Sequence, residues 1–239
     1  MSGLENTIAV AYHKLTEIAQ HRGQLYWIFS MGFTNPTLEF IDNIQSGALV
    51  GELQKSLDAL MLTDLHYGAA LLNLAGLAAQ SRYDDSRAFL TQLRVEYMRL
   101  FIAPRDPVTP IYEALHRDNT NGDEKPLLFV SSTAVAVEKI YHAAGVQMAK
   151  HDSPDHLVTE LEYLAYLCSK EADAWKADNN TMGKKWRRME QEFLDEHLGK
   201  WAIKLCRQVM EQSTEPFYRD FAALAATFLH MEAGAFQPK

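Results

Sequence analysis

The chain has 239 residues, of which 47% are apolar and 23% are charged, shares that are ordinary for a folded protein and argue against disorder. Its twelve glycines and eight prolines are too few for the many turns of a β-sandwich or barrel, so the composition favours long helices. The net charge of −8 argues against a nucleic-acid partner, which needs a basic face. We therefore expect a single all-α domain, a helical bundle over residues 1–239.

Cysteine usage and apolar stretches indicate the compartment. Cys168 and Cys206 lie in apolar helical patterns and give no disulfide framework. The first residues lack the basic and apolar regions of a secretory signal. The most apolar stretch, residues 69–79, is shorter than the roughly 20 residues that a membrane span needs. The sequence thus predicts a cytoplasmic protein without stable membrane association.

Apolar residues recur at helical spacing along almost the whole chain. Residues 1–22 predict a leading helix that is loosely attached to the rest. Asn35 followed by Pro36 indicates a helix start, and Gly47 indicates a helix end. The sequence shows no internal repeat and no low-complexity segment. About eleven helices are predicted, at about 5–20, 22–32, 36–45, 48–60, 63–81, 85–101, 132–144, 154–177, 182–196, 199–212 and from 216 onward.

Capping residues set several of these boundaries in the second half of the chain. Asp84 or Asp85 is the expected N-cap of the helix that runs to about residue 101. Gly145 ends a helix, because glycine readily adopts the left-handed conformation that closes one. Ser153 is expected to cap the following helix, with Pro154 at its first position.

One proline-rich interval interrupts the helical pattern. Pro104, Pro107 and Pro110 fall within seven residues, which forbids a helix and predicts an extended, stiff segment. A polar stretch follows it, so we expect a long loop over residues 102–126. Loops of this length are often functional.

Residues 96–104 and 110–113 form the first group of candidate functional residues. Helix geometry places Glu96 and Arg99 beside an apolar stripe. One interpretation is a core helix with a solvated ion pair. The other is a hydrophobic groove with an acidic rim beside a stiff proline loop, which can hold an extended or helical peptide. The stripe consists of Leu93, Tyr97, Leu100 and Phe101.

Residues 151–156, together with Glu160, form the second group. They are consistent with a simple helix start, in which Asp155 favours the positive end of the helix dipole and His156 pairs with Glu160 on the surface. They are also consistent with a polar clamp at the mouth of a groove, where Asp155 meets a cationic ligand. A metal site is the third interpretation, although no His-Glu-x-x-His element completes it. Its donors would be His151, Asp152, His156 and Glu160.

The rest of the sequence gives only weak signals for a catalytic or binding site. Residues 184–188 contain Arg187 and Arg188 side by side, and we interpret this basic stretch as a solvated helix face. No Gly-x-Ser-x-Gly elbow, phosphate loop or dinucleotide-binding fingerprint occurs in the sequence. Cys168 and Cys206 have no histidine near them in sequence, so we expect buried structural thiols.

The order of these motifs resembles the TorD/DmsD/NarJ family of cytoplasmic chaperones for molybdoenzymes. The resemblance covers about residues 23–232. Ala103 and Ile111 depart from the glycine and the aromatic residue that are usual in the family. The motifs that carry the resemblance are Glu96-Tyr97-x-Arg99-Leu100-Phe101-x-Ala103-Pro104, Pro110-x-Tyr112-Glu113, Pro154-Asp155-His156-Leu157-x-x-Glu160-Leu161-Glu162-Tyr163-Leu164-Ala165, Phe193-x-x-Glu196-His197-Leu198-x-x-Trp201 and Pro216-Phe217-Tyr218.

This resemblance implies a chaperone that is not an enzyme and has no cofactor of its own. It implies binding of the twin-arginine signal peptide and the apo-form of a molybdopterin oxidoreductase subunit, so that cofactor insertion precedes export. Such a leader carries two arginines beside an apolar segment, which suits an acidic rim around an apolar groove. We expect Asp155, His156 and Glu160 to make the polar contact. The full set of candidate peptide-binding residues is Glu96, Tyr97, Leu100, Phe101, Pro104, Pro110, Tyr112, Glu113, Asp155, His156 and Glu160.

Two other functions stay open at the level of the sequence. One is a metal-dependent hydrolase built on the cluster of His151, Asp152, His156 and Glu160. The other is a nucleotide-responsive protein, because guanine-nucleotide binding has been proposed for some members of the family, although the sequence holds no phosphate cradle. The oligomeric state is open between a monomer and a domain-swapped dimer hinged at 104–125 or 178–181.

Overall fold

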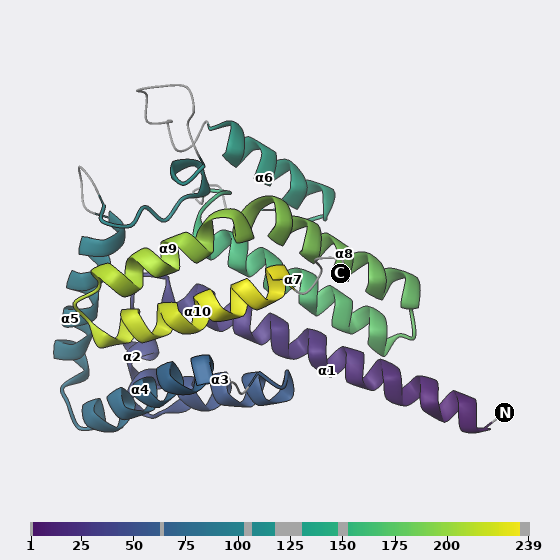
Figure 1. The fold of residues 1–239 in the computed structure, drawn as a ribbon, viewed down its shortest axis with the longest axis horizontal. Helices are drawn as coiled ribbons and strands as arrows, with labels where there is room; N and C mark the ends of the chain where they lie inside the picture. The colour runs from purple at the N-terminus through teal and green to yellow at the C-terminus, as the bar shows by residue number, and fades with distance from the viewer. Residues whose placement is uncertain (1, 63–64, 103–106, 118–130, 148–152, 235–239) are drawn as a thin grey trace.

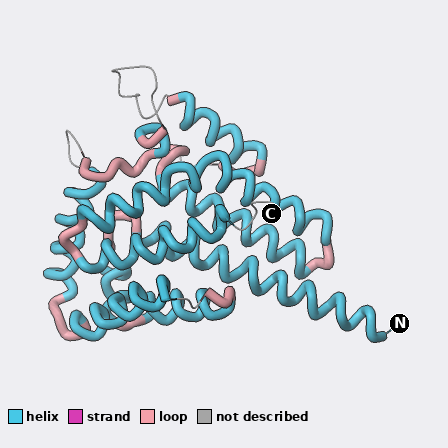
Figure 2. Tube along the Cα trace, in the orientation of Figure 1, coloured by secondary structure: helices cyan, strands magenta, loops and turns pink. Residues whose placement is uncertain are grey.

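The protein is an assembly of helices, and no strand occurs among the residues that its structure describes (Figures 1 and 2). The predicted all-α fold class is confirmed. None of the described helices is both long enough and apolar enough to cross a membrane. The computed structural model describes residues 2–62, 65–102, 107–117, 131–147 and 153–234.

Two π-helical turns extend the α-helices. Met98–Ile102 continues the fifth helix, and Leu194–Leu198 joins the eighth to the ninth, so that residues 180–212 are helical without a break. A short 3-10 helix spans Glu113–Leu115. The α-helices are α1 (Ser2–Gly32), α2 (Leu38–Gln45), α3 (Ala48–Ala59), α4 (Leu65–Ser81), α5 (Ser86–Tyr97), α6 (Ser132–Ala143), α7 (Leu157–Lys176), α8 (Asn180–Phe193), α9 (Gly199–Gln212) and α10 (Pro216–Gly234).

Helices α1 and α7 lie side by side along the long axis of the molecule (Figure 1). Gly23 permits their close approach, because a Cβ atom at this position would lie only 3.0 Å from the Cβ atom of Cys168. Cys168 is fully buried, and burial raises the pKa of its thiol. Burial likewise raises the pKa of Cys206 to about 12, so both cysteines are the buried, inert thiols that the sequence predicts.

An aromatic core joins α1 to α10. The ring centroids of Tyr26 and Phe228 are 5.0 Å apart, and those of Phe29 and Phe221 are 5.5 Å apart, both edge to face. Gly32 lies directly under Phe221, where a Cβ atom would come within 2.1 Å of the ring. The α10 helix itself lies between α9 and α4, and its aromatic contacts with α1 link the first helix to the last (Figure 1).

A buried ionic network, which we call the arginine cluster, joins α1, α7, α8 and α10. Arg22 is 4% exposed, and its Nε and Nη2 atoms donate to Glu190 at 3.2 and 3.0 Å. Although burial alone would raise the pKa of Glu190, Arg22 and Arg187 lower it. The solvated face predicted for residues 184–188 is therefore wrong for Arg187. The cluster consists of Arg22, Glu171, Arg187, Glu190 and Glu232.

The boundary predicted near residue 21 is wrong, because α1 continues through it to Gly32. Arg22 lies at that point, and its bonds inside the bundle hold the helix together there. The N-terminal half of α1 also contacts α7, because the Tyr12 ring stacks on the Trp175 ring with centroids 5.8 Å apart. The segments at 5–20 and 22–32 thus form one element.

The predicted caps are partly confirmed. The Asp85 carboxylate accepts from the Arg87 amide at 2.9 Å and caps α5, and Gly145 has the left-handed φ of 78° expected after α6. The start predicted at Asn35 is wrong, because the Thr37 side chain accepts from the Phe40 amide and caps α2.

Candidate functional site

Residues 107–117, which we call the strap, are the described part of the predicted loop at 102–126. The strap contains no α-helix, and only a single 3-10 turn forms near its end. Its first anchor is Thr109, which is fully buried and donates from both its amide and its hydroxyl to the Leu100 carbonyl, at 2.9 and 3.1 Å. These two hydrogen bonds therefore hold the start of the strap in place, although no α-helix forms there.

The strap crosses the residues that precede α7. An isolated antiparallel bridge joins Tyr112 to His156. This pairing gives the strap backbone partners of the kind found in a sheet, although no sheet forms in the described part of the chain. The two bonds that flank the bridge run from the Leu157 amide to the Ile111 carbonyl at 3.0 Å and from the Glu113 amide to the Asp155 carbonyl at 2.9 Å.

Asp155 has no exposed surface and uses both carboxylate oxygens inside the protein. Its Oδ1 atom accepts from the Ser153 hydroxyl at 2.6 Å, and its Oδ2 atom accepts from the Ala114 amide at 3.2 Å. The N-cap predicted at Ser153 is wrong, because His156 takes that role and its Nδ1 atom accepts from the Val158 amide at 3.2 Å. Asp155 therefore ties the strap to the start of α7.

Glu113 is the second fully buried carboxyl of this site. Its Oε1 atom accepts from the Arg117 Nε atom at 2.7 Å, and its Oε2 atom lies 3.0 Å from the His197 Nδ1 atom. Arg117 is half exposed, whereas His197 is buried. Glu113 thus connects the strap to the π-helical turn between α8 and α9.

Glu160 is the third buried carboxyl, and its exposed fraction is also zero. Its Oε2 atom accepts from the Trp201 Nε1 atom at 3.1 Å. Its Oε1 atom has no hydrogen-bond partner among the described groups. Burial, followed by the charge of Glu113, raises the pKa of Glu160 well above its usual range.

We call these three buried carboxyls and their hydrogen-bond donors the carboxyl cluster. The surface pairing predicted for His156 and Glu160 is wrong, because Glu160 points into the protein. The exposed acidic rim predicted from these residues is wrong for the same reason. The cluster consists of Glu113, Asp155 and Glu160 with Arg117, His197 and Trp201.

A half-buried layer covers the carboxyl cluster. Tyr112 and His156 meet edge to face, with ring centroids 5.0 Å apart. His116 stacks on Trp201 at 5.2 Å and also bonds to the Pro110 carbonyl. Pro110, Tyr112 and His156 each keep part of their surface exposed. Among the candidate residues, these three are therefore available for contact with a partner.

Glu96 belongs to a separate cluster at the start of the last helical hairpin. Its carboxylate accepts from the Arg99 Nε atom at 2.7 Å, the Ser213 hydroxyl at 3.0 Å and the Thr214 amide at 2.6 Å. Although burial alone would raise it, these hydrogen bonds lower the pKa of Glu96 to about 2. At 3% exposure, Glu96 ties α5 to the α9–α10 turn and does not line an open rim.

The other candidates of this stretch lie in the core. Leu100 and Phe101 are 0% and 2% exposed, and the Phe101 ring meets Phe33 at 6.2 Å. Tyr97 is also buried, and burial, followed by the neighbouring Tyr112, raises its pKa to about 12. The core interpretation of this helix is confirmed, and its apolar stripe lies beneath the strap rather than in an open groove.

Three of the predicted residues, Pro104, His151 and Asp152, lie outside the described residues. Within the described ranges, no group of three or more His, Cys, Asp and Glu side chains is arranged to hold a metal ion. Glu160 accepts from an indole, Glu113 from a guanidinium, and Asp155 from a backbone amide, and these three donors are not metal ligands.

Three members of the carboxyl cluster were missed as site residues. His197 and Trp201 appear only as part of a family motif, and Arg117 in no motif at all. Spacing offers a signal in hindsight, since Glu113 and Arg117 are four residues apart and so are His197 and Trp201. The spacing does not show that Glu113 and Arg117 lie near His197 and Trp201, because only the folded chain brings these two pairs together.

Comparison with known proteins identifies relatives of this chain. Selenate reductase assembly chaperone protein from Thauera selenatis is 31% identical over 102 residues, which are 42% of this chain and 51% of that protein. The chain thus matches about half the length of this curated relative. A crystal structure of a proposed redox enzyme maturation protein from Archaeoglobus fulgidus is 19% identical, with a TM-score of 0.47 over 87% of this chain and 93% of that one.

A family model described as nitrate reductase delta subunit matches residues 63–207. This range is more than half of the chain and contains the strap and every member of the carboxyl cluster. The resemblance seen in the sequence motifs is therefore confirmed. The chain belongs to the nitrate reductase delta subunit family, a family of redox enzyme maturation chaperones for molybdoenzymes.

Proposed function

We propose that this protein is a chaperone that binds the twin-arginine leader and the apo-form of a molybdopterin oxidoreductase subunit, assists insertion of its cofactor and prevents premature export. One observation carries the proposal: motif residues far apart in the sequence meet in the carboxyl cluster, under a strap of non-helical backbone. Exposed non-helical segments fixed by a rigid scaffold are common places for partner recognition. The name of the Thauera selenatis relative supports an oxidoreductase as the client.

In this proposal the leader contacts the half-buried layer formed by Pro110, Tyr112 and His156. An aromatic ring and a proline offer apolar contact, and an imidazole offers hydrogen bonds. The carboxyls of Glu113, Asp155 and Glu160 lie behind this layer, where Glu113 and Asp155 hold the strap in place.

The remaining candidates support the strap from below. Leu100 accepts both bonds from Thr109, and Phe101 and Tyr97 fill the core under it. Glu96 fixes the helix that carries them. The net charge of −8 favours encounter with a doubly basic leader and makes that encounter sensitive to salt.

Calorimetry with a synthetic leader peptide tests the proposal. The peptide is the twin-arginine leader of a molybdopterin oxidoreductase subunit, and a matched peptide carries two glutamines in place of its two arginines. We expect the arginine peptide to bind, and the glutamine peptide to bind at least about tenfold more weakly, because charge-assisted bonds are lost. Equal binding of the two peptides, or no binding of either, contradicts the proposed function.

The place of binding is tested by Tyr112→Ala. We expect this variant to bind the leader about tenfold more weakly, because the aromatic contact is lost. Tyr83→Ala is the matched control, since Tyr83 is 90% exposed and lies in the turn before α5. Circular dichroism should show the same helix content in all three proteins. Unchanged affinity of Tyr112→Ala places the leader elsewhere on the protein.

A further inference from the structure

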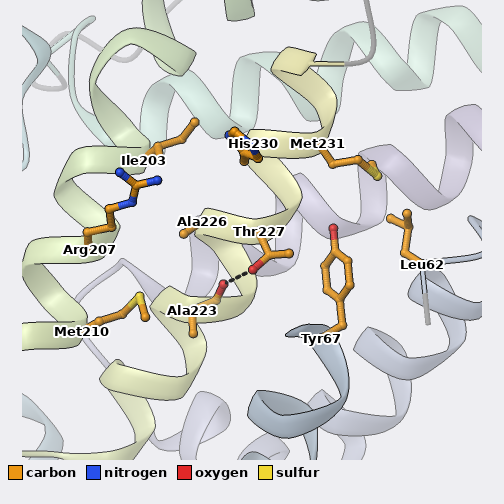
Figure 3. Close-up of a pocket in the computed structure, with 10 residues that line it drawn as sticks. All are labelled: Leu62, Tyr67, Ile203, Arg207, Met210, Ala223, Ala226, Thr227, His230 and Met231. Carbon is orange, nitrogen blue, oxygen red and sulfur yellow. Dashed lines mark hydrogen bonds between the residues drawn. The ribbon is translucent and has the colours of Figure 1, made fainter. Parts of the chain in front are cut away.

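A second surface, far in sequence from the strap, lies over α10. It is a pocket of about 680 Å³, lined by residues of α4, α9 and α10 and by Leu62, which follows α3 (Figure 3). α10 forms the floor, since Ala223, Ala226 and Thr227 lie at its centre. α9 stands on one side, and Tyr67 and Leu62 stand on the other, across α10 (Figure 3). We call this surface the α10 valley.

The spacing of the lining residues matches the shape of a helix. On α9, Ile203, Arg207 and Met210 follow one another at intervals of four and three, so they share one face. The floor residues of α10 are small, and the Thr227 hydroxyl is satisfied by the Ala223 carbonyl at 2.8 Å. A floor of small side chains between two walls leaves room for another helix, as in helix-in-groove recognition.

The valley is apolar and adaptable along its length. Met210 stands on the α9 wall and Met231 on α10, and the thioether side chain of methionine adjusts to different partners. Leu62 and Ile203 add branched side chains at opposite walls (Figure 3). Such a lining suits the apolar stripe of an amphipathic helix.

The charge of the valley is opposite to that of the protein as a whole. Arg207 and His230 line it, and none of the described lining residues carries a carboxylate. The Arg207 guanidinium is directed toward the end of the valley where His230 lies (Figure 3). Within the described part of the chain, Arg207 is exposed and pairs with no carboxylate. A protein with a net charge of −8 therefore offers an unpaired cation at an apolar surface.

We propose that the α10 valley binds an amphipathic α-helix of a partner protein, with the apolar stripe of that helix on Ala223 and Ala226 and an acidic side chain on Arg207. This partner differs in charge from the doubly basic leader, which Arg207 repels. The inference goes beyond the proposed function, because it assigns a second binding surface with the opposite electrostatic preference.

Two synthetic helical peptides of about 18 residues test the proposal. They share one leucine stripe, and their polar faces carry glutamates in one peptide and lysines in the other. We expect fluorescence anisotropy to show that the full chain binds the glutamate peptide at least about tenfold more tightly than the lysine peptide. Equal affinities, or no binding of the glutamate peptide, overturn the proposal.

Two exposed arginines provide a matched pair of variants. Arg207→Glu should abolish the preference for the glutamate peptide, because the rim then carries the same charge as the peptide. Arg188→Glu makes the same charge change on α8, outside the valley, and should leave the affinity within about twofold. If Arg207→Glu binds the glutamate peptide as tightly as the wild type does, the valley is not the site.

A dye placed in the floor locates the peptide. Both native cysteines are fully buried, so Ala226→Cys provides a single accessible thiol for an environment-sensitive fluorophore. We expect its emission to shift when the glutamate peptide is added. A shift that appears with protein concentration alone would identify a second copy of this chain as the occupant and overturn the proposal.

Titration of the leader peptide on the same variants keeps the two proposals separate. Arg207→Glu should bind the leader as the wild type does, because the strap lies elsewhere. If the wild type does not bind the leader, only the proposed function is contradicted. The preference between the two helical peptides is measured in the absence of the leader, so it tests the α10 valley separately.

Discussion

Two buried charged clusters in the described part of the chain differ in the groups that face their carboxyls. The arginine cluster contains two guanidinium groups and three carboxyls, and it joins four helices. The carboxyl cluster also contains three carboxyls, but its one guanidinium, that of Arg117, is half exposed, and its other side-chain partners are the His197 imidazole and the Trp201 indole. It joins helices to a strap rather than helices to one another.

This difference indicates different tasks. A buried network with two guanidinium donors fixes one arrangement of helices, and it becomes costly when a partner is removed. In the carboxyl cluster Glu160 pairs with no cation among the described residues, and its raised pKa makes the free energy of unfolding depend on pH. Natural proteins accept such local costs most often at functional sites. The comparison therefore supports the strap, rather than the arginine cluster, as the place of function.

The largest effect is expected from Arg22→Met. This change leaves Glu190 and Glu171 buried without their main cation, so we expect the free energy of unfolding to fall by about 3–5 kcal/mol. Urea unfolding followed by circular dichroism measures it. Arg188→Met is the control, because Arg188 is exposed, and it should change the stability by less than about 0.5 kcal/mol. A loss below about 1 kcal/mol for Arg22→Met would contradict the importance of the cluster.

A smaller and more local effect is expected from Asp155→Ala. The change leaves the Ala114 amide and the Ser153 hydroxyl without an acceptor, which should cost about 1–3 kcal/mol. Hydrogen exchange should show faster exchange at Glu113 and Ala114 than in helix α10. The control is Asp173→Ala, an exposed carboxylate on α7. Uniform acceleration over all helices would show that the carboxyl cluster stabilises the whole bundle and not the strap.

Glu96 shows how a carboxyl with enough donors behaves. Because its folded-state pKa lies at about 2, below the usual 4.5, its contribution to stability is present above pH 4.5 and is lost as the pH falls toward 2. Glu96→Gln should cost about 1 kcal/mol at neutral pH, through loss of the charge-assisted bonds. Thermal unfolding from pH 5 to pH 2.5 should show a flatter acid dependence for the variant. Parallel pH curves for the two proteins would refute this assignment.

The smallest effect, of opposite sign, is expected from Glu160→Gln. Because burial raises the folded-state pKa of Glu160, the wild type is favoured below pH 4.5 and loses stability as the pH rises toward the folded-state pKa. Glutamine keeps the acceptor for Trp201 and has no ionisable proton, so the cost of burying it does not change with pH. The variant should be more stable than the wild type by about 1 kcal/mol at pH 8 and equal to it at pH 4. Glu192→Gln, at an exposed site, should show neither effect.

The fold was largely predictable because its signals are local. Asp85, Gly145 and Pro216 set helix ends through short-range chemistry, and the structure has the ends where these residues indicate. The prediction failed at residue 21, where nothing in the local pattern shows that Arg22 is held by a distant helix.

The sequence selected the residues of the candidate site but did not show their geometry. Glu113, Asp155 and Glu160 were predicted as an exposed acidic rim, and they are fully buried. Their acidic character suggests exposure, since carboxyls are rarely buried without partners. Their partners, such as His197, lie on other helices, and the spacing of residues within the motifs does not indicate these contacts.

The sequence by itself determined the helical class, most helix ends and the absence of an α-helix from residues 107–117. These features depend on residues within a few positions of one another, whose backbone preferences act in any context. The tertiary structure alone decided which charges are buried and what they contact. Glu160 meets Trp201 at a separation of 41 residues, and Arg22 meets Glu171 at a separation of 149. Such contacts exist only after the chain has packed, because burial is a property of the assembled helices and not of any single one.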